Sequence, residues 1–343
     1  MLFRSHDNAG SQGSKGEREV LRGYGNELQL LEDKPRAWDA WNVGLTGVKY
    51  PLKLRKVELV ERGPVRATLR VTWDYLQPGV KKDDPTPEYP SSFFTQEVML
   101  YPGIERVDFK TDADWWEEKT MIKVAFPVSV DDTVATYEIP YGTIRRSTQW
   151  RNSWDSAKVE VSAQRWADLS HGDYGVSLLN KSKYGYDIKK NVMRLSLLRS
   201  PKWPDPTADR GRHSIEYALY PHPGNWKKGN TVRAGYEYNN PLIAVLGEPH
   251  KGKLPMSQSF IRLEPASLVL TTVKKAEDSD AWIVQWYDAG GEDTEGILTL
   301  PSSPKKAVKT NFLEQDGTPV RFIKNVARIA TKHHSIVTVK AYF

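Results

Sequence analysis

The chain has 343 residues, 39% hydrophobic and 11% aromatic, which is enough to bury the cores of about two domains. Its 49 basic and 43 acidic residues are mixed along the chain, and the formal charge of +6 therefore does not indicate nucleic-acid binding. The absence of cysteine excludes disulfides and thiolate metal sites. No apolar run approaches the roughly 20 residues of a membrane span, and no signal peptide is visible. The sequence leaves the compartment open and favours a cytoplasmic location.

Strands dominate the predicted secondary structure. Residues 65–76 alternate apolar and polar side chains with period two, and residues 93–100 and 104–112 give two more such runs. The tripeptide Tyr-Pro-Gly between these two runs is typical of a tight turn. The alternation returns in four later segments: residues 158–161, 175–180, 192–199 and 213–222. Helical periodicity is hard to find, so the sequence predicts an all-β protein built of sandwiches.

A change of composition divides the chain. The alternation stops near Leu246, and Gly, Pro, Lys and Ser dominate up to Gln258, after which a new set of strands begins. We interpret residues 16–247 as a large β-sandwich and residues 258–343 as a small one. Residues 1–15 are expected to be a linker or non-native, in a chain that is a truncated gene product.

Three groups of polar residues are candidates for chemistry. The first group is acidic and consists of Asp112, Asp114, Glu117 and Glu118. Paired carboxylates cleave glycosides, and the neighbouring Trp115 and Trp116 suit the apolar face of a sugar. The alternative, which we favour, is an acidic turn between two strands.

The other two groups contain histidine. His171 lies between Asp168 and Asp173, but a metal site needs three or four ligands, so we expect Asp168 and His171 to bind turn amides in a scaffold. His333 and His334 are adjacent and are predicted to point to opposite faces of a strand, so they cannot hold one ion together. No nucleophile elbow, phosphate loop or HExxH motif is present, and the sequence shows no complete set of catalytic residues.

Longer motifs carry a family resemblance. Six of them follow in this order: NELQLLEDKPRAWDAWNV, ADWWEEKTMIKVAFPV, YEIPYGTIRRSTQW, AQRWADLSHGDYGVSLLNKSKYGYDI, LLRSPKWPDPTADRGRHSIEYALYPHPGNW and SLVLTTVKKAEDSDAWIVQWYD. The series resembles the C-terminal half of the family 38 glycoside hydrolases, the α-mannosidases, in their bacterial and cytosolic-type branch, over about residues 17–343. The resemblance implies a large mutarotase-like supersandwich followed by a smaller β-sandwich domain.

The same resemblance implies an activity whose catalytic groups lie elsewhere. Members of the family release terminal α-mannose with retention, and their aspartate nucleophile and zinc ligands lie in an upstream catalytic domain. Nothing in this sequence matches those groups. We therefore expect no catalytic residue, no metal site and no cofactor in this chain, zinc in the complete enzyme, and no activity of the chain alone.

Two segments are candidates for contact with a sugar. In the first, Trp38 and Trp41 bracket Asp39 in a stretch too rich in proline for a central strand. Tryptophan rings stack on the apolar faces of sugars, and a carboxylate binds their hydroxyls. The alternative is that both rings fill an interface with the catalytic domain.

The second segment is the loop of residues 200–213. It holds three Pro and a Gly between two predicted strands, and long loops in compact domains are often functional. The resemblance implies that such a loop sends an arginine toward the active site, and Arg210 is the matching residue. The alternative is that Arg210 pairs with Asp205 or Asp209 on an exposed loop.

Two hypotheses of function follow. Either the chain is the non-catalytic C-terminal part of an α-mannosidase, or it is a stand-alone carbohydrate-binding module. The first has the absent catalytic domain and a mannoside as partners, allows a homo-oligomer, and predicts an apolar docking patch. The second predicts a polar surface with an exposed aromatic platform. A mutarotase-like enzyme is disfavoured, because no paired His and carboxylate are evident.

Overall fold

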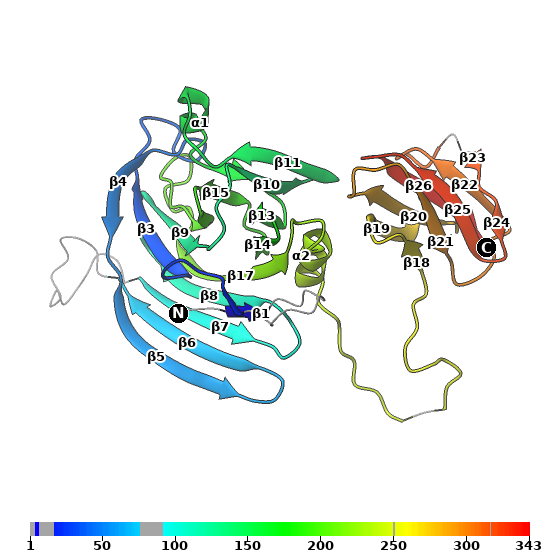
Figure 1. Ribbon diagram of the computed structural model, residues 1–343, viewed down its shortest axis with the longest axis horizontal. Coiled ribbons are helices and arrows are strands. Elements are labelled where there is room, and N and C mark those ends of the chain that lie inside the picture. The colour runs from blue at the N-terminus through cyan, green and yellow to red at the C-terminus, as the bar shows by residue number, and fades with distance from the viewer. Residues whose placement is uncertain (1–3, 7–16, 76–91, 250, 316) are drawn as a thin grey trace. The chain divides into compact units, whose positions relative to one another are not determined.

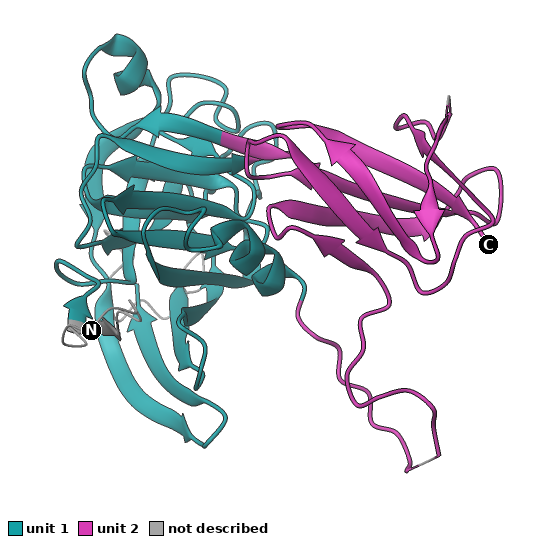
Figure 2. Cartoon of the chain, turned by 45° about the vertical axis from the view of Figure 1, so that its right-hand side comes forward, with its two compact units in different colours: residues 1–138, 144–240 teal, residues 139–143, 241–343 magenta. Residues whose placement is uncertain are grey.

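Strands make up 51% of the chain and helices 5%, so the predicted all-β class is confirmed. The structure, a computed structural model, describes residues 4–6, 17–75, 92–249, 251–315 and 317–343 (Figure 1). The chain divides into two compact units (Figure 2): residues 1–138 with 144–240, and residues 139–143 with 241–343. Most of residues 1–15 lie outside the described residues, and the predicted domain limits of 16–247 and 258–343 stay a prediction.

The first unit contains two large antiparallel sheets. The nine-stranded sheet has the order β11 (Gly142–Ser147), β10 (Val134–Ile139), β13 (Trp166–His171), β14 (Tyr174–Asn180), β17 (Gly211–Pro223), β8 (Val107–Trp115), β7 (Phe93–Leu100), β6 (Ala67–Asp74) and β5 (Lys53–Arg62). The six-stranded sheet has the order β12 (Val161–Ser162), β15 (Gly185–Lys189), β16 (Val192–Leu198), β9 (Thr120–Pro127), β3 (Glu27–Asp33) and β4 (Leu45–Tyr50). A separate two-stranded ribbon pairs β1 (Arg4–His6) with β2 (Glu17–Glu19).

One apolar core joins these two sheets. Phe109 of β8 packs on Phe126 of β9 with ring centroids 5.3 Å apart, and on Tyr217 of β17 at 5.4 Å. All three rings are buried. Because side chains alternate along each strand, the opposite face of each sheet is left for polar residues.

The second unit is a smaller sandwich with a core of its own. Its five-stranded sheet has the order β19 (Leu268–Lys275), β20 (Trp282–Asp288), β26 (Ile336–Tyr342), β22 (Lys306–Thr310) and β23 (Thr318–Pro319). Its four-stranded sheet has the order β18 (Arg262–Glu264), β21 (Thr294–Thr299), β25 (Val326–Thr331) and β24 (Phe322–Ile323). Trp286 of β20 and Leu298 of β21 are fully buried in the shared core.

Two short helices were not predicted. Helix α1 (Ser153–Ala157) begins where Asn152 accepts a hydrogen bond from the amide of Asp155 at 2.9 Å. The chain leaves α1 at Lys158, so the predicted strand 158–161 is wrong over most of its length, and β12 pairs only from Val161. Helix α2 (Thr231–Asn239) is too short for its periodicity to be recognised. Neither of these described helices is long and apolar enough to span a membrane.

Two further predictions need correction. The strand predicted from residue 104 begins at Val107, because the turn extends through hydrogen bonds from the Ile104 amide to Tyr101 O and from the Arg106 amide to Ile104 O. His333 and His334 do not lie in a strand: they form the turn between β25 and β26, where His333 Nδ1 lies 2.8 Å from an Asp293 oxygen.

Candidate functional site

The Trp-Asp-Ala-Trp segment lies in the loop between β3 and β4. Trp38 has a left-handed φ of 61°, and its carbonyl accepts the amides of both Trp41 and Asn42 at 2.9 Å, which closes a tight turn. This turn leaves the side chains of Trp38 and Trp41 58% and 65% exposed. The two rings are therefore not part of the described core.

A third indole joins these two rings. Trp203, which is 47% exposed, comes from the loop between β16 and β17, and its ring centroid lies 4.9 Å from that of Trp38 and 5.3 Å from that of Trp41. The centroids of Trp38 and Trp41 are 6.1 Å apart. We call Trp38, Trp41 and Trp203 the tryptophan cluster. Its first two members are predicted from the sequence, but Trp203 is not.

Backbone and side-chain hydrogen bonds hold the two loops together. The Lys202 amide donates to Asp39 Oδ2 at 3.3 Å. Arg199 donates from Nε to Asp33 Oδ2 at 2.7 Å and from Nη1 to the carbonyl of Ala40 at 3.2 Å, and its own amide donates to Asp209 at 2.9 Å. The two segments predicted to contact sugar are thus brought to one place.

Arg210 lies on the same loop as Trp203 and pairs with a carboxylate from the turn between β8 and β9. Its guanidinium donates to Glu118 Oε1, which also accepts the ammonium of Lys202. Asp205 and Asp209, the alternative partners considered from the sequence, accept hydrogen bonds from Thr207 and from the Arg199 amide. Arg210 is mostly covered, whereas Glu118 is partly exposed.

The surface around the tryptophan cluster combines apolar rings with fixed charges. Its rings offer faces on which the C–H side of a pyranose can stack, and Asp39 and Glu118 offer hydrogen-bond acceptors. The cations Lys202 and Arg210 both pair with Glu118, and Asp39 adds a second carboxylate, so these charges balance and the surface is suited to a polar neutral ligand. The role of Trp38, Asp39, Trp41 and Arg210 as substrate-binding residues stays a prediction.

The acidic group at residues 112–118 was expected to form one turn between two strands, and this prediction is wrong. Asp112 and Asp114 lie in β8, where Asp112 pairs with Lys110 at 3.1 Å and Asp114 accepts the indole of Trp116 at 2.6 Å. Glu117 follows the strand, is buried, and accepts Ser92 Oγ at 2.7 Å. The carboxylates of this group therefore bind different partners.

The residues around His171 also serve the scaffold, with one difference from the prediction. Asp168 does not bind turn amides: it is buried in β13 and accepts Ser177 Oγ at 2.8 Å, with His222 Nε2 at 2.7 Å. His171 Nδ1 lies 2.9 Å from Asp132 Oδ2, and Asp173 pairs with Arg18 at 3.2 Å. Each group has its own partner, so they form no joint site.

The described residues include no group of three or more His, Cys, Asp or Glu side chains placed to hold a metal ion. They therefore do not fit the zinc that the family resemblance implies, since a zinc site in a protein takes three or four such ligands.

Comparison with known protein families shows which family the chain belongs to. The domain described as "Glycosyl hydrolases family 38 C-terminal domain" matches residues 12–207, more than half of the chain. The chain belongs to glycosyl hydrolase family 38. The "Glycosyl hydrolases family 38 C-terminal beta sandwich domain" matches residues 267–340, in the smaller sandwich. The resemblance to the C-terminal half of family 38 is confirmed, and the bacterial and cytosolic-type branch stays a prediction.

Individual relatives in family 38 agree with this placement. The chain is 37% identical to human alpha-mannosidase 2C1 over 88% of its own length and 28% of that protein. It is 32% identical to the alpha-mannosidase of Saccharomyces cerevisiae over 80% of its length and 25% of that protein. It thus spans about a quarter of the curated relatives it matches. An alpha-mannosidase from Enterococcus faecalis V583 has the same fold, with a TM-score of 0.73 at 15% identity, covering 96% of this chain and 39% of that one.

Proposed function

We propose that the chain is the non-catalytic C-terminal part of an α-mannosidase that hydrolyses terminal α-mannosides. The nucleophile and the zinc ion belong to an upstream catalytic domain, which is the partner of this chain in the complete enzyme. The single observation that carries the proposal is the match of both sandwiches, in order, to C-terminal domains of family 38. A cytoplasmic location and a homo-oligomer stay predictions.

The exposed edge of the nine-stranded sheet supports a docking partner. Strand β5 forms that edge, and it carries four exposed apolar side chains: Leu54, Val57, Leu59 and Val60. Apolar residues in such density on an edge strand favour aggregation unless something covers them. We propose that the catalytic domain covers β5 in the complete enzyme.

The tryptophan cluster supports a second role for this part of the enzyme. We propose that Trp38, Asp39, Trp41 and Arg210 contribute to the rim of the mannoside pocket. The proposal is supported by the exposure of the rings and by the hydrogen bonds that hold both loops in place.

The test of the main proposal is zinc-dependent hydrolysis of an aryl α-mannoside. We expect no turnover from this chain alone, with or without zinc, and turnover when the chain is produced with its upstream region. Turnover by the isolated chain would refute the proposal.

The rim is tested in the extended enzyme. Trp41→Ala and Arg210→Ala are expected to raise KM or lower kcat about tenfold or more, while the melting temperature changes little. The control is Trp154→Ala, which removes a more exposed indole far along the sequence from both loops. An unchanged rate in both rim variants contradicts the rim role.

The exposed aromatic cluster also favours a second candidate, a stand-alone carbohydrate-binding module. This candidate predicts that the isolated chain binds mannose oligosaccharides through Trp38, Trp41 and Trp203, and that no upstream region is needed. Calorimetric titration of the isolated chain separates the two: binding that Trp41→Ala abolishes supports the module, and its absence supports the rim, which needs the catalytic domain to close.

A further inference from the structure

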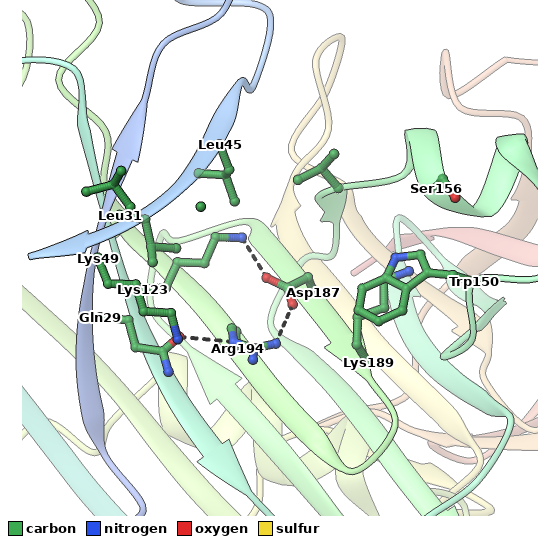
Figure 3. Close-up of a pocket in the computed structure, with 13 residues that line it drawn as sticks. Gln29, Leu31, Leu45, Lys49, Lys123, Trp150, Ser156, Asp187, Lys189 and Arg194 are labelled. Carbon is green, nitrogen blue, oxygen red and sulfur yellow. Dashed lines mark hydrogen bonds and ion pairs between the residues drawn. The ribbon is translucent and has the colours of Figure 1, made fainter.

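A pocket of about 380 Å³ lies on the outer face of the six-stranded sheet (Figure 3). Its floor consists of polar residues that alternate with core residues along their strands, such as Lys123 in β9, Asp187 in β15 and Arg194 in β16. Strand β4 lines one side, and the segment that includes Trp150 and Ser156 of α1 lines the other. The volume is within the range of about 300–1,000 Å³ of small-molecule sites.

A fixed charge network forms the floor. The buried Lys123 ammonium contacts Asp187 Oδ2 at 2.6 Å and Glu160 Oε2 at 3.0 Å. Asp187 accepts Arg194 Nη1 at 3.0 Å, and Arg194 Nε donates to Gln29 at 3.1 Å. Each buried charge thus has a partner of opposite sign, which offsets its desolvation and holds the floor rigid.

Two further cations line the pocket without such partners. Among the described residues, no carboxylate lies within 4.0 Å of the ammonium of Lys49 or Lys189. With Lys123 and Arg194 the lining of the pocket has four cations and one carboxylate, that of Asp187, and Glu160 pairs with Lys123 from outside the lining. Burial lowers the pKa of Lys189, although the nearby carboxylates of Asp187 and Asp155 partly oppose this shift. The pocket is therefore electropositive.

An aromatic ring lies next to this positive charge. Trp150 is 60% exposed, and Lys189 Nζ lies 5.2 Å from the centre of its ring. Leu31 and Leu45 add apolar surface from β3 and β4. An indole face, small apolar patches and several hydrogen-bonding groups together suit a pyranose ring, and the excess cations suit a negative group on that ring.

We propose that this pocket binds an anionic sugar, a pyranose that carries one carboxylate or phosphate group. The negative group pairs with Lys189, the ring stacks beside Trp150, and its hydroxyls bind Asp187 and Arg194, while Lys49 adds positive charge from the opposite side. The pocket shares no residue with the tryptophan cluster. The proposal of an anionic-sugar site is therefore tested independently of the proposed function.

The test is calorimetric titration of the full chain with four probes: glucuronate, glucose 6-phosphate, mannose and inorganic phosphate. We expect glucuronate or glucose 6-phosphate to bind at least tenfold more tightly than mannose and than inorganic phosphate. Binding should weaken as salt is raised, because an ion pair contributes to it. Which of the two anionic sugars binds more tightly identifies the negative group.

Two matched pairs of variants locate the site. Trp150→Ala is expected to weaken binding about tenfold, whereas Trp154→Ala, which removes a 78% exposed indole that does not line the pocket, leaves it unchanged. Lys189→Gln is expected to weaken binding similarly, and the exposed neighbour Lys190→Gln to leave it unchanged. All four side chains are at least partly exposed, so the fold is expected to survive, which melting curves check.

Three results would overturn the proposal. One is no binding of either anionic sugar at 10 mM, about the weakest affinity that such a site would show. Another is equal binding of mannose, which removes the role of the charge, or of inorganic phosphate, which removes the role of the sugar ring. The third is equal loss of binding in a variant and its matched control, which places the ligand outside the pocket.

Discussion

Arg199 is the residue on which the geometry of the tryptophan cluster depends most. Its guanidinium pairs with the buried carboxylate of Asp33, and it also donates to the carbonyls of Ala40 and Asn42. It thereby connects the end of β16 to the loop that follows β3. Removal of one partner from a buried ion pair leaves the other charge without compensation.

Arg199→Met is accordingly expected to lower the free energy of unfolding by about 3 kcal/mol. It is also expected to reduce the near-ultraviolet circular dichroism of the coupled indoles, because the two loops separate. Arg233→Met is the control, since the Arg233–Glu237 pair is exposed and worth less than about 0.5 kcal/mol. Equal effects of the two substitutions in urea denaturation would contradict this role.

Glu32, next to Asp33 at the end of β3, makes the stability of the fold depend on pH. Its carboxylate accepts hydrogen bonds from Lys34, from Thr46 at 2.7 Å and from Tyr50 at 2.9 Å, and these lower the pKa of Glu32 to about 2. A carboxyl with a lowered folded pKa stabilises the fold above its unfolded value of 4.5, and this stabilisation is lost as the pH falls toward 2.

Glu32→Gln is therefore expected to lower the melting temperature at pH 6, by a difference that narrows at pH 3. Thermal unfolding at the two pH values measures it, with the exposed Glu292→Gln as a control that changes little at either pH. A difference that stays constant between pH 6 and pH 3 would show that the charge of Glu32 is not the cause.

At the scale of elements, helix α2 packs closely on the nine-stranded sheet. A Cβ atom added at Gly235 would lie 2.9 Å from Cδ1 of Trp166, which is buried in β13. Gly235 therefore allows a close approach of the helix rather than a special backbone conformation.

Gly235→Ala is expected to destabilise the protein by about 1–3 kcal/mol, although alanine has the higher helix propensity. Gly63→Ala is the control, because its new Cβ would meet only backbone atoms, at 3.6 Å and 4.0 Å, both ordinary van der Waals distances. Stabilisation of the chain by Gly235→Ala in urea denaturation would mean that α2 moves away from Trp166 without cost.

The sequence predicts elements best where one face of a strand is buried. Residues 93–100 alternate clearly and form β7 with the predicted limits. The segment at residues 158–161 fails because helix α1, which is only one turn long, has no periodicity to show. Trp38 and Trp41 were found because they are close in sequence, whereas Trp203 joins them through a contact that only the pairing of β3, β9 and β16 brings about.

At the scale of the whole molecule, the two units have separate cores. Trp115 and Tyr217 are buried in the first, and Trp286 and Val337 in the second. Residues 241–249 and 251–260, between the two sets of strands, have no regular secondary structure and are exposed. A sandwich with its own apolar core is able to remain folded when a connection to its neighbour is cut.

Limited proteolysis is therefore expected to cut first within residues 241–249 or 251–260 and to leave a stable fragment of about the last 85 residues, since exposed segments without regular secondary structure are cleaved first. Mass spectrometry of the fragments identifies the site. First cleavage inside β19–β26 would show that the smaller sandwich is less stable than its core suggests.

The tryptophan cluster also has an optical consequence. Of the twelve tryptophans, Trp115, Trp166 and Trp286 are fully buried, whereas the three indoles of the cluster are in contact with both water and one another. Their emission, like that of the exposed Trp150 and Trp154, is expected at longer wavelength than that of the buried rings and is expected to be quenched by acrylamide. Any partner that covers the cluster, whether a sugar or a protein domain, is expected to shift the cluster's share of this emission to the blue and to protect that share from the quencher. The chain thus carries its own fluorescent reporter of occupancy, without a label.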